Sequence, residues 1–239
     1  MEYKIVGDVM QALQMELQQG EEVYAEAGSM LYISQGIDLQ AKMQGGFMKG
    51  LMRKFLAGES LFMSCFRGVA PNAKMALANP IAGKIFPIEL RGNTILAERN
   101  AFLCAIGNVD LSVAFTKKFG AGLFGGEGFI LQKLEGQGLA FIHAGGTIVA
   151  RDLAAGETLR LDTGCLVAFE PRVNYDIQFA GGVKTALFGG EGLFFATLTG
   201  PGRVWLQSLP FSRLAGRMLA AVFASKDEGS ILGGFGMGS

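Results

Sequence analysis

Apolar and polar residues alternate along several short stretches of the chain. Leu13, Met15 and Leu17 fall on one side of the first stretch, while Gln14 and Glu16 fall on the other. The same alternation recurs over residues 22–27 and 159–162. A period of two is typical of a strand with one buried face. Because glycine turns separate these short runs and the chain holds only 6 prolines, the pattern predicts an all-β sandwich or barrel.

One hexapeptide recurs along the chain. Leu-Phe-Gly-Gly-Glu-Gly occupies Leu123–Gly128 and Leu187–Gly192, and a degenerate copy, Phe-Leu-Ala-Gly-Glu-Ser, occupies Phe55–Ser60. Turn residues keep a regular spacing around each copy, with Gly68, Gly136 and Gly200 after it and the pairs Gly20 and Gly28, Gly92 and Asn100, and Gly156 and Gly164 before it. Glycine suits such positions because it tolerates positive φ and a close approach of other backbone.

The spacing of these markers predicts internal repetition. The second and third copies are offset by 64 residues, from Gly92 to Gly156 and again from Gly126 to Gly190. We therefore predict three tandem β-sandwich repeats of a double-stranded β-helix-like kind, related by pseudo-threefold symmetry and followed by a C-terminal helix. The predicted repeats span residues 1–80, 81–148 and 149–208. Each is too small to bury a large core alone.

The first repeat contains an insertion that does not follow the strand pattern. Residues 45–57 carry apolar side chains at helical spacing and basic ones on another face, which indicates a short amphipathic helix or helical loop. Its candidate contact surface consists of Phe47, Met48, Lys49, Leu51, Met52, Arg53 and Lys54. Such a surface can contact a membrane or a protein partner. It can also pack on the edge of the sheet, and the sequence leaves both interpretations open.

A second helix is predicted after the last repeat, over residues 209–224. Ser208 is a candidate cap, and Pro210 suits the first turn. The helix would serve as a lid on the β assembly or as a contact between subunits. The glycine-rich end, residues 225–239, is predicted to be a mobile tail.

Composition favours an oligomer. Half of the residues are hydrophobic, yet no apolar run approaches the roughly 18–20 residues that a membrane span needs. The surplus apolar surface therefore suits subunit interfaces, and we expect a homo-oligomer. The first residues lack the pattern of a secretory signal, and the 3 cysteines are widely spaced in apolar runs, so we expect a cytoplasmic protein with reduced thiols.

Few residues offer chemistry. The run Gly120–Gly125 matches G-x-G-x-x-G, but it leads into a β-type segment, whereas dinucleotide binding needs a parallel βαβ unit. His143 is the single histidine, and we interpret it as structural because no triad or zinc set can be assembled around it. We therefore expect no enzymatic activity, no cofactor and no metal. A formal net charge of zero also gives no reason to expect a nucleic-acid partner.

Three carboxylates occupy equivalent places in the repeats: Glu59, Glu127 and Glu191. In a glycine turn, a carboxylate can accept hydrogen bonds from nearby amides and fix the corner. Alternatively, repeat symmetry could gather the three into a ring that binds a cation or a basic partner. Both roles remain hypotheses at this stage.

The chain resembles the bacterial branch of the altered-inheritance-of-mitochondria protein family. The resemblance rests on the three-repeat layout, the Leu-Phe-Gly-Gly-Glu-Gly turns and the motif Leu-Thr-Gly-Pro-Gly-Arg-Val-Trp-Leu-Gln at Leu198–Gln207, and it extends over about residues 3–223. It implies β-sandwich repeats similar to a subunit of the tryptophan RNA-binding attenuation protein, and a homotrimer that forms a ring of nine repeats. It implies no catalytic residues.

The leading hypothesis is a non-catalytic scaffold or binding protein that acts as a homotrimeric ring and contacts membranes or a partner. A nucleic-acid-binding ring is the alternative that follows from fold kinship alone, and fold does not fix function. A small-molecule or metal-dependent enzyme is a third hypothesis, for which Glu59, Glu127 and Glu191 are the visible candidate residues.

The contact surface of the insertion can be tested by charge reversal. Replacing Lys49, Arg53 and Lys54 with Glu should abolish association with anionic liposomes or a partner, because like charges then oppose each other at the surface. The oligomeric state should not change. Liposome co-sedimentation and light scattering measure the two properties, and unchanged association would exclude this surface as the contact.

Overall fold

The computed structural model describes residues 1–41, 63–117, 129–179, 194–218 and 221. The amphipathic segment 45–57 and the tail 225–239 lie outside these residues, as do the hexapeptide carboxylates Glu59, Glu127 and Glu191. The described part consists mainly of antiparallel β-sheet, as the alternation predicted, with a short C-terminal helix.

The strands fall into three groups along the chain. The N-terminal group contains β1 (Glu2–Val6), β2 (Ala12–Leu17), β3 (Glu22–Glu26), β4 (Met30–Ile33), β5 (Ile37–Ala41), β6 (Met63–Gly68) and β7 (Ala73–Ala78). The central group contains three long strands, β8 (Gly83–Glu98), β9 (Phe102–Lys117) and β10 (Phe129–Gly145). The C-terminal group contains β11 (Ile148–Leu153), β12 (Thr158–Asp162), β13 (Leu166–Phe169), β14 (Asn174–Phe179), β15 (Phe194–Thr199) and β16 (Gly202–Gln207).

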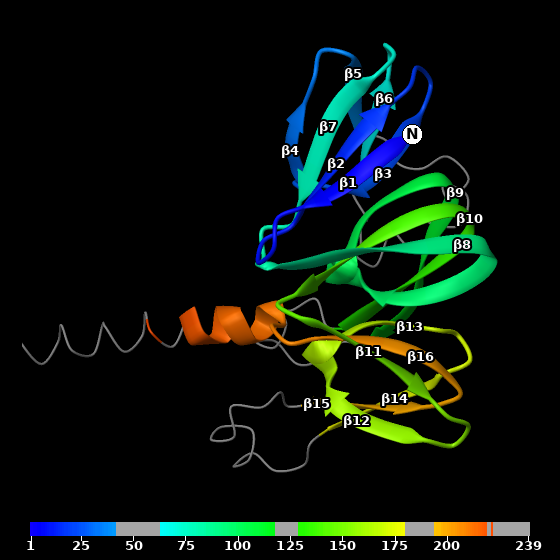
Figure 1. The fold of residues 1–239 in the computed structure, drawn as a ribbon. Coiled ribbons are helices and arrows are strands. Elements are labelled where there is room, and N and C mark those ends of the chain that lie inside the picture. Colours follow the sequence, from blue (N-terminus) through cyan, green and yellow to red (C-terminus); the bar gives the residue numbers. More distant parts are fainter. Residues whose placement is uncertain (42–62, 118–128, 180–193, 219–220, 222–239) are drawn as a thin grey trace, which may run out of the picture.

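The groups are stacked in chain order, with the N-terminal group in blue and cyan at the top of Figure 1, the central group in green and the C-terminal group in yellow and orange. Within the described residues the sheets have the orders β1-β2-β7-β4, β11-β16-β13-β8-β10-β9-β3-β6-β5 and β12-β15-β14. The nine-stranded sheet runs through all three groups because the long central strands pair with both neighbours.

Strand pairing in the N-terminal group matches that in the C-terminal group. Strand β7 lies between β2 and β4, and β6 lies between β3 and β5. In the C-terminal group β16 lies between β11 and β13, and β15 lies between β12 and β14. In the central group both halves of β10 lie between β8 and β9. All these pairings are antiparallel.

The predicted alternation places the core. Leu13, Met15 and Leu17 on β2 are at most 3% exposed, and Val23 and Ala25 on β3 are fully buried. These side chains form one cluster with residues of the central group, among them Leu103 and Phe141. On β12 the same pattern leaves Leu159 and Leu161 only half-buried, because β12 lies at the edge of its sheet. The N-terminal core therefore extends across the boundary into the central group.

The C-terminal helix begins close to its predicted start, at residue 211, and is described through 218. Ser208 does not cap it; its hydroxyl instead accepts a hydrogen bond from the Thr147 amide at 2.9 Å. The Pro210 carbonyl accepts the first helical hydrogen bond, from the Arg213 amide at 3.1 Å. Phe211 and Met218 are 56% and 60% exposed, so nothing in the described part of the chain covers the helix at these two apolar positions.

The marker glycines have two distinct physical roles. Gly20, Gly92 and Gly156 adopt φ of 88°, 84° and 79°, which is the left-handed region that glycine tolerates best. Gly68 serves close packing instead, because a Cβ at this position would lie 2.3 Å from the Gln18 carbonyl oxygen. Its amide donates to the Glu21 carbonyl, and its carbonyl accepts from the Gly20 amide, so the backbone cannot easily move away.

Substitution of Gly68 by Ala should therefore destabilise the fold. We expect a loss of about 1–3 kcal/mol, typical of overpacking, and a fall in Tm of about 2–4 °C for each kcal/mol. Gly216→Ala is the matched control, because nothing lies within 4 Å of the added Cβ and alanine favours helix. Thermal unfolding by circular dichroism measures both; equal Tm values would contradict the packing role of Gly68.

Candidate functional site: the open strand edges

The residues most suited to catalysis are buried. His143 on β10 is 3% exposed, and burial lowers its pKa to about 4, so it is neutral at pH 7. Cys65 and Cys104 are buried and Cys165 is half-buried. Burial raises the pKa of the Cys104 thiol, which opposes formation of the reactive thiolate. Within the described ranges, no three His, Cys, Asp or Glu side chains gather as a metal would require.

A carboxylate is the last residue of the corresponding strand in each group. Glu26 ends β3, Glu98 ends β8 and Asp162 ends β12. The side chain of Glu98 accepts from the Asn100 amide at 2.9 Å, and that of Asp162 accepts from the Gly164 amide at 2.9 Å. These bonds cap the short 3-10 turns η2 (Arg99–Ala101) and η4 (Thr163–Cys165). The sequence pattern did not single out these carboxylates, although each stands two residues before the second marker of a pair, namely Gly28, Asn100 or Gly164.

Two of these carboxylates are close enough to influence each other. Burial raises the pKa of Glu98 to about 8, and the nearby charge of Glu26 adds to the effect. Burial also raises the pKa of Glu26 to about 7, against the attraction of Arg99. The third member, Asp162, forms an ion pair at 2.9 Å with Arg213 of the C-terminal helix. The boundary between the N-terminal and central groups thus holds two carboxyl groups that favour the protonated form.

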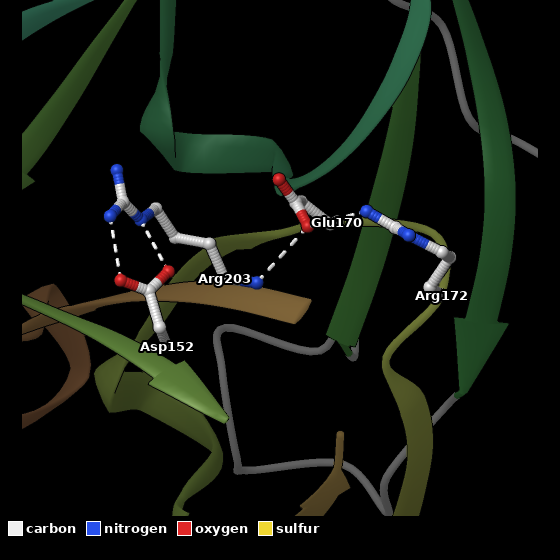
Figure 2. A network of polar contacts seen from close by, with 4 residues as sticks. All are labelled: Asp152, Glu170, Arg172 and Arg203. Carbon is white, nitrogen blue, oxygen red and sulfur yellow. Dashed lines mark hydrogen bonds and ion pairs between the residues drawn. The ribbon is translucent and has the colours of Figure 1, made fainter. Parts of the chain in front are cut away.

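An exposed polar network lies on the C-terminal group (Figure 2). The Arg203 guanidinium on β16 donates to both carboxylate oxygens of Asp152 on β11, at 2.7 and 2.6 Å. The Arg203 amide donates to the Glu170 carboxylate at 3.2 Å, and Arg172 lies 3.9 Å from the same carboxylate. Hydrogen bonding from Arg203 lowers the pKa of Asp152. The network links β11, β16 and the residues after β13, and its bidentate pair is already satisfied within the chain.

A shallow hollow of about 220 Å³ lies on the sheet β1-β2-β7-β4. Its polar lining includes Glu2, Lys4, Glu16 and Lys74, and Tyr32 of β4 forms one side. Acidic and basic groups are balanced there, so the hollow shows no preference for an anion or a cation.

Strand β4 exposes apolar side chains in a row. Met30, Leu31 and Tyr32 are 45%, 59% and 41% exposed, and β4 has no neighbour on its outer side in the described sheets. An edge strand with exposed apolar side chains is a template for pairing with another chain. Strand β12 forms the corresponding open edge of the C-terminal group. These two edges are the strongest candidate for a functional surface among the described residues.

The strands that correspond to β4 are buried. In β9, Phe102, Leu103 and Cys104 are at most 3% exposed, and Leu166, Val167 and Ala168 in β13 are fully buried. All three strands carry a register irregularity at the same point, where two residues that are two apart pair with two adjacent residues of the neighbouring strand. Met30 and Tyr32 pair with Leu77 and Ala76, Phe102 and Cys104 with Ile142 and Phe141, and Leu166 and Ala168 with Leu206 and Trp205. Their difference in burial therefore comes from the neighbouring strand that β4 lacks.

Comparison with known proteins places the chain in a family. The family described as mitochondrial biogenesis AIM24 matches residues 3–209. The chain belongs to the AIM24 family. An uncharacterised protein of Streptococcus pyogenes serotype M6 is 29% identical over 213 residues, which cover 86% of this chain and 84% of that protein. An X-ray crystal structure of a Streptococcus pyogenes protein matches with a TM-score of 0.75 at 26% identity, covering 92% of this chain and 99% of the other.

The family membership confirms the resemblance inferred from the sequence, and it supplies no activity, since these AIM24 relatives are themselves uncharacterised. The described residues include no helix that is both long and apolar enough to cross a membrane. The geometry of the open edges is therefore the main guide to what this AIM24 chain does.

The raised pKa of Glu98 predicts a pH-dependent stability. Its folded pKa is about 8 and its ordinary value is 4.5, so the folded state binds the proton more tightly. Stability should then fall as pH rises from about 4.5 to about 8, and above that this carboxyl adds no further loss. Glu98→Gln, whose amide oxygen can still accept from Asn100, should gain about 1–3 kcal/mol over wild type at pH 8 and little at pH 5.

Urea unfolding at fixed protein concentration, between pH 5 and 8, measures the difference. The matched control is Glu16→Gln on the outer face of β2, for which the gain should be absent. His143 is present in every variant, so its own titration cancels in the comparison. A gain for Glu98→Gln that is the same at pH 5 and pH 8 would contradict the raised pKa.

Proposed function

We propose that this protein is a non-catalytic scaffold or binding protein that acts as a homotrimeric ring. In this proposal each chain contributes three copies of one two-sheet unit, related by pseudo-threefold symmetry, and three chains form a ring of nine. The matching strand pairings of the N-terminal and C-terminal groups support the repeated unit. The register irregularity at the same point of β4, β9 and β13 supports it as well.

One observation carries the proposal. Met30, Leu31 and Tyr32 are exposed by 41% or more, while the corresponding residues of β9 and β13 are at most 3% exposed. Burying apolar surface stabilises by about 25 cal/mol per Å², and an unpaired strand edge adds unsatisfied backbone donors and acceptors. A second chain on β4 would remove both costs.

The non-catalytic part of the proposal is supported by where the reactive side chains lie. His143, Cys65 and Cys104 are buried within the β assembly, and the exposed Asp152–Arg203 pair is satisfied within the chain. The proposed role at a membrane or partner rests on the sequence of the segment 45–57 alone, which lies outside the described residues.

The proposal predicts a native mass of three chains. Leu31→Glu should shift that mass towards the monomer, because a carboxylate at a residue that is 59% exposed in the single chain would become buried and unpaired in the ring. The same exposure means that the monomer itself should stay folded. Light scattering coupled to size exclusion measures the mass, and circular dichroism verifies the fold.

Val69→Glu is the matched control, because Val69 is 49% exposed but follows β6 and belongs to neither open strand. It should leave the mass unchanged. A monomeric wild type at micromolar concentration would overturn the proposal, as would a Leu31→Glu variant that keeps the full mass.

A further inference from the structure

Neighbouring groups in the chain are already joined by one type of strand pairing. Strand β3 of the N-terminal group pairs with β9 of the central group, with Ala25 opposite Cys104 and Tyr24 opposite Ala105. Strand β8 of the central group pairs with β13 of the C-terminal group, with Ala97 opposite Ala168 and Leu96 opposite Phe169. Both junctions are antiparallel, and both join a strand that ends in a carboxylate to a strand with the register irregularity.

The two junctions also share one register. Ala25 and Ala97 each stand three residues before the second marker of their group, Gly28 or Asn100. Their partners Cys104 and Ala168 each stand four residues after the second marker of the following group, Asn100 or Gly164. The same two spacings identify the residues that would occupy these positions in the open strands β12 and β4. Leu161 stands three residues before Gly164, and Tyr32 stands four residues after Gly28.

We infer that β12 of one copy pairs antiparallel with β4 of the next copy, with Leu161 opposite Tyr32 and Arg160 opposite Ile33. This inference rests on the proposed ring and specifies which strands join it and in which register. The junction is head-to-tail, because β12 and β4 are different surfaces of the same chain. Such heterologous contacts form closed rings when the rotation between copies closes.

The side chains at the open edges fit this junction. Leu159 and Leu161 on β12 are half-buried, whereas their counterparts Val23 and Ala25 on β3 are fully buried. On the other side, Met30 and Leu31 are exposed where the β13 residues Leu166 and Val167 are fully buried. Pairing the two edges would therefore bring both sets towards the burial that the internal junctions already show.

One large and one small side chain occupy the same cross-strand pair in all three groups. Cys104 lies opposite Phe141, Ala168 opposite Trp205, and Tyr32 opposite Ala76. Phe141 and Trp205 each contact an aromatic ring from the preceding group, Tyr3 at 4.9 Å and Phe86 at 6.1 Å between ring centroids. Tyr32 is the aromatic residue of the N-terminal group at this level, and it is 41% exposed.

The residue that would cover Tyr32 belongs to the other end of the chain. Phe86, on the first part of β8, packs on Trp205 of the following group. When β8 and β11 are aligned through their pairing to β10 and β16, Val149 takes the place of Phe86. Val149 is 45% exposed. In the head-to-tail junction it would lie over Tyr32 and Ala76 of the next copy, so the exposed apolar residues at the two ends complement each other.

Other sheet edges do not match this pattern. Strands β1, β5, β11 and β14 also end their sheets in the described part of the chain. None of them corresponds to β3, β8, β9 or β13 at the strand segments that join groups. The internal junctions thus favour β4 and β12 over every other pair of open edges.

Cysteine cross-linking tests the register. Directly opposite residues of an antiparallel pair have Cβ atoms about 4.5–5.5 Å apart, and diagonal ones about 7–8 Å, while a disulfide needs about 3.5–4.5 Å. In a Cys165→Ala background, which removes the half-buried native thiol, the pair Tyr32→Cys with Leu161→Cys should form reducible intermolecular disulfides under mild oxidation. Non-reducing electrophoresis should show most of the protein as covalent dimers and trimers.

Three controls define the result. Tyr32→Cys alone and Leu161→Cys alone should give no cross-link, since each thiol then faces a residue without one. Tyr32→Cys with Leu159→Cys, shifted by two residues, should give a several-fold lower yield. Light scattering and circular dichroism on the reduced variants verify that the oligomer and the fold are retained.

The outcomes separate this inference from the proposed function. Trimers that cross-link only through the pair at 32 and 161 support both. An oligomer that cross-links instead through Tyr32→Cys alone, or equally through the shifted pair, or through none of the pairs, overturns the head-to-tail junction and leaves the ring standing. A monomeric wild type overturns both.

Discussion

Backbone hydrogen bonding at strand edges is the constraint on which this structure depends. Each group of strands ends in sheet edges, and a sheet edge leaves backbone amides and carbonyls without partners. Within the chain, edges of neighbouring groups pair with each other twice, where β3 joins β9 and where β8 joins β13. These two junctions create the nine-stranded sheet, bring residues of two groups into a common core, and leave β4 and β12 as the corresponding open strands.

The hydrophobic pattern and the glycine markers predicted much of this architecture. The alternation over 13–17 placed the buried face of β2 correctly, because strict alternation of apolar and polar residues is typical of a strand with one buried face. The turn markers Gly20, Gly92 and Gly156 do adopt positive φ. The marker Gly68 reflects close packing instead, and the sequence could not distinguish these two uses of glycine. The described start of the C-terminal helix also lies close to its predicted start.

Other features depend on contacts that no local pattern contains. Strand β4 and its counterpart β13 have similar apolar sequences. Their opposite burial arises because β13 pairs with β8, whereas β4 has no strand on that side in the described sheets. The carboxylates Glu26 and Glu98 were missed for a similar reason. Each ends a strand whose sequence has no unusual feature, and its pKa is raised because partial burial at the group boundary disfavours the charged form. The carboxylates predicted from the hexapeptide, Glu59, Glu127 and Glu191, lie outside the described residues and stay a prediction.

The boundary between the N-terminal and central groups places two half-buried carboxylates next to a strand pairing, and this links the electrostatics to the assembly. At the first boundary, Glu26 and Glu98 approach each other and both favour the protonated form. At the open end of β12 the corresponding residue is Asp162, which is already neutralised by Arg213 of the C-terminal helix. If a second copy pairs with β12, its Glu26 would lie by Asp162 as Glu98 lies by Glu26 at the first boundary. The helix would then serve the assembly electrostatically, by supplying a cation to the carboxylate at the junction between chains.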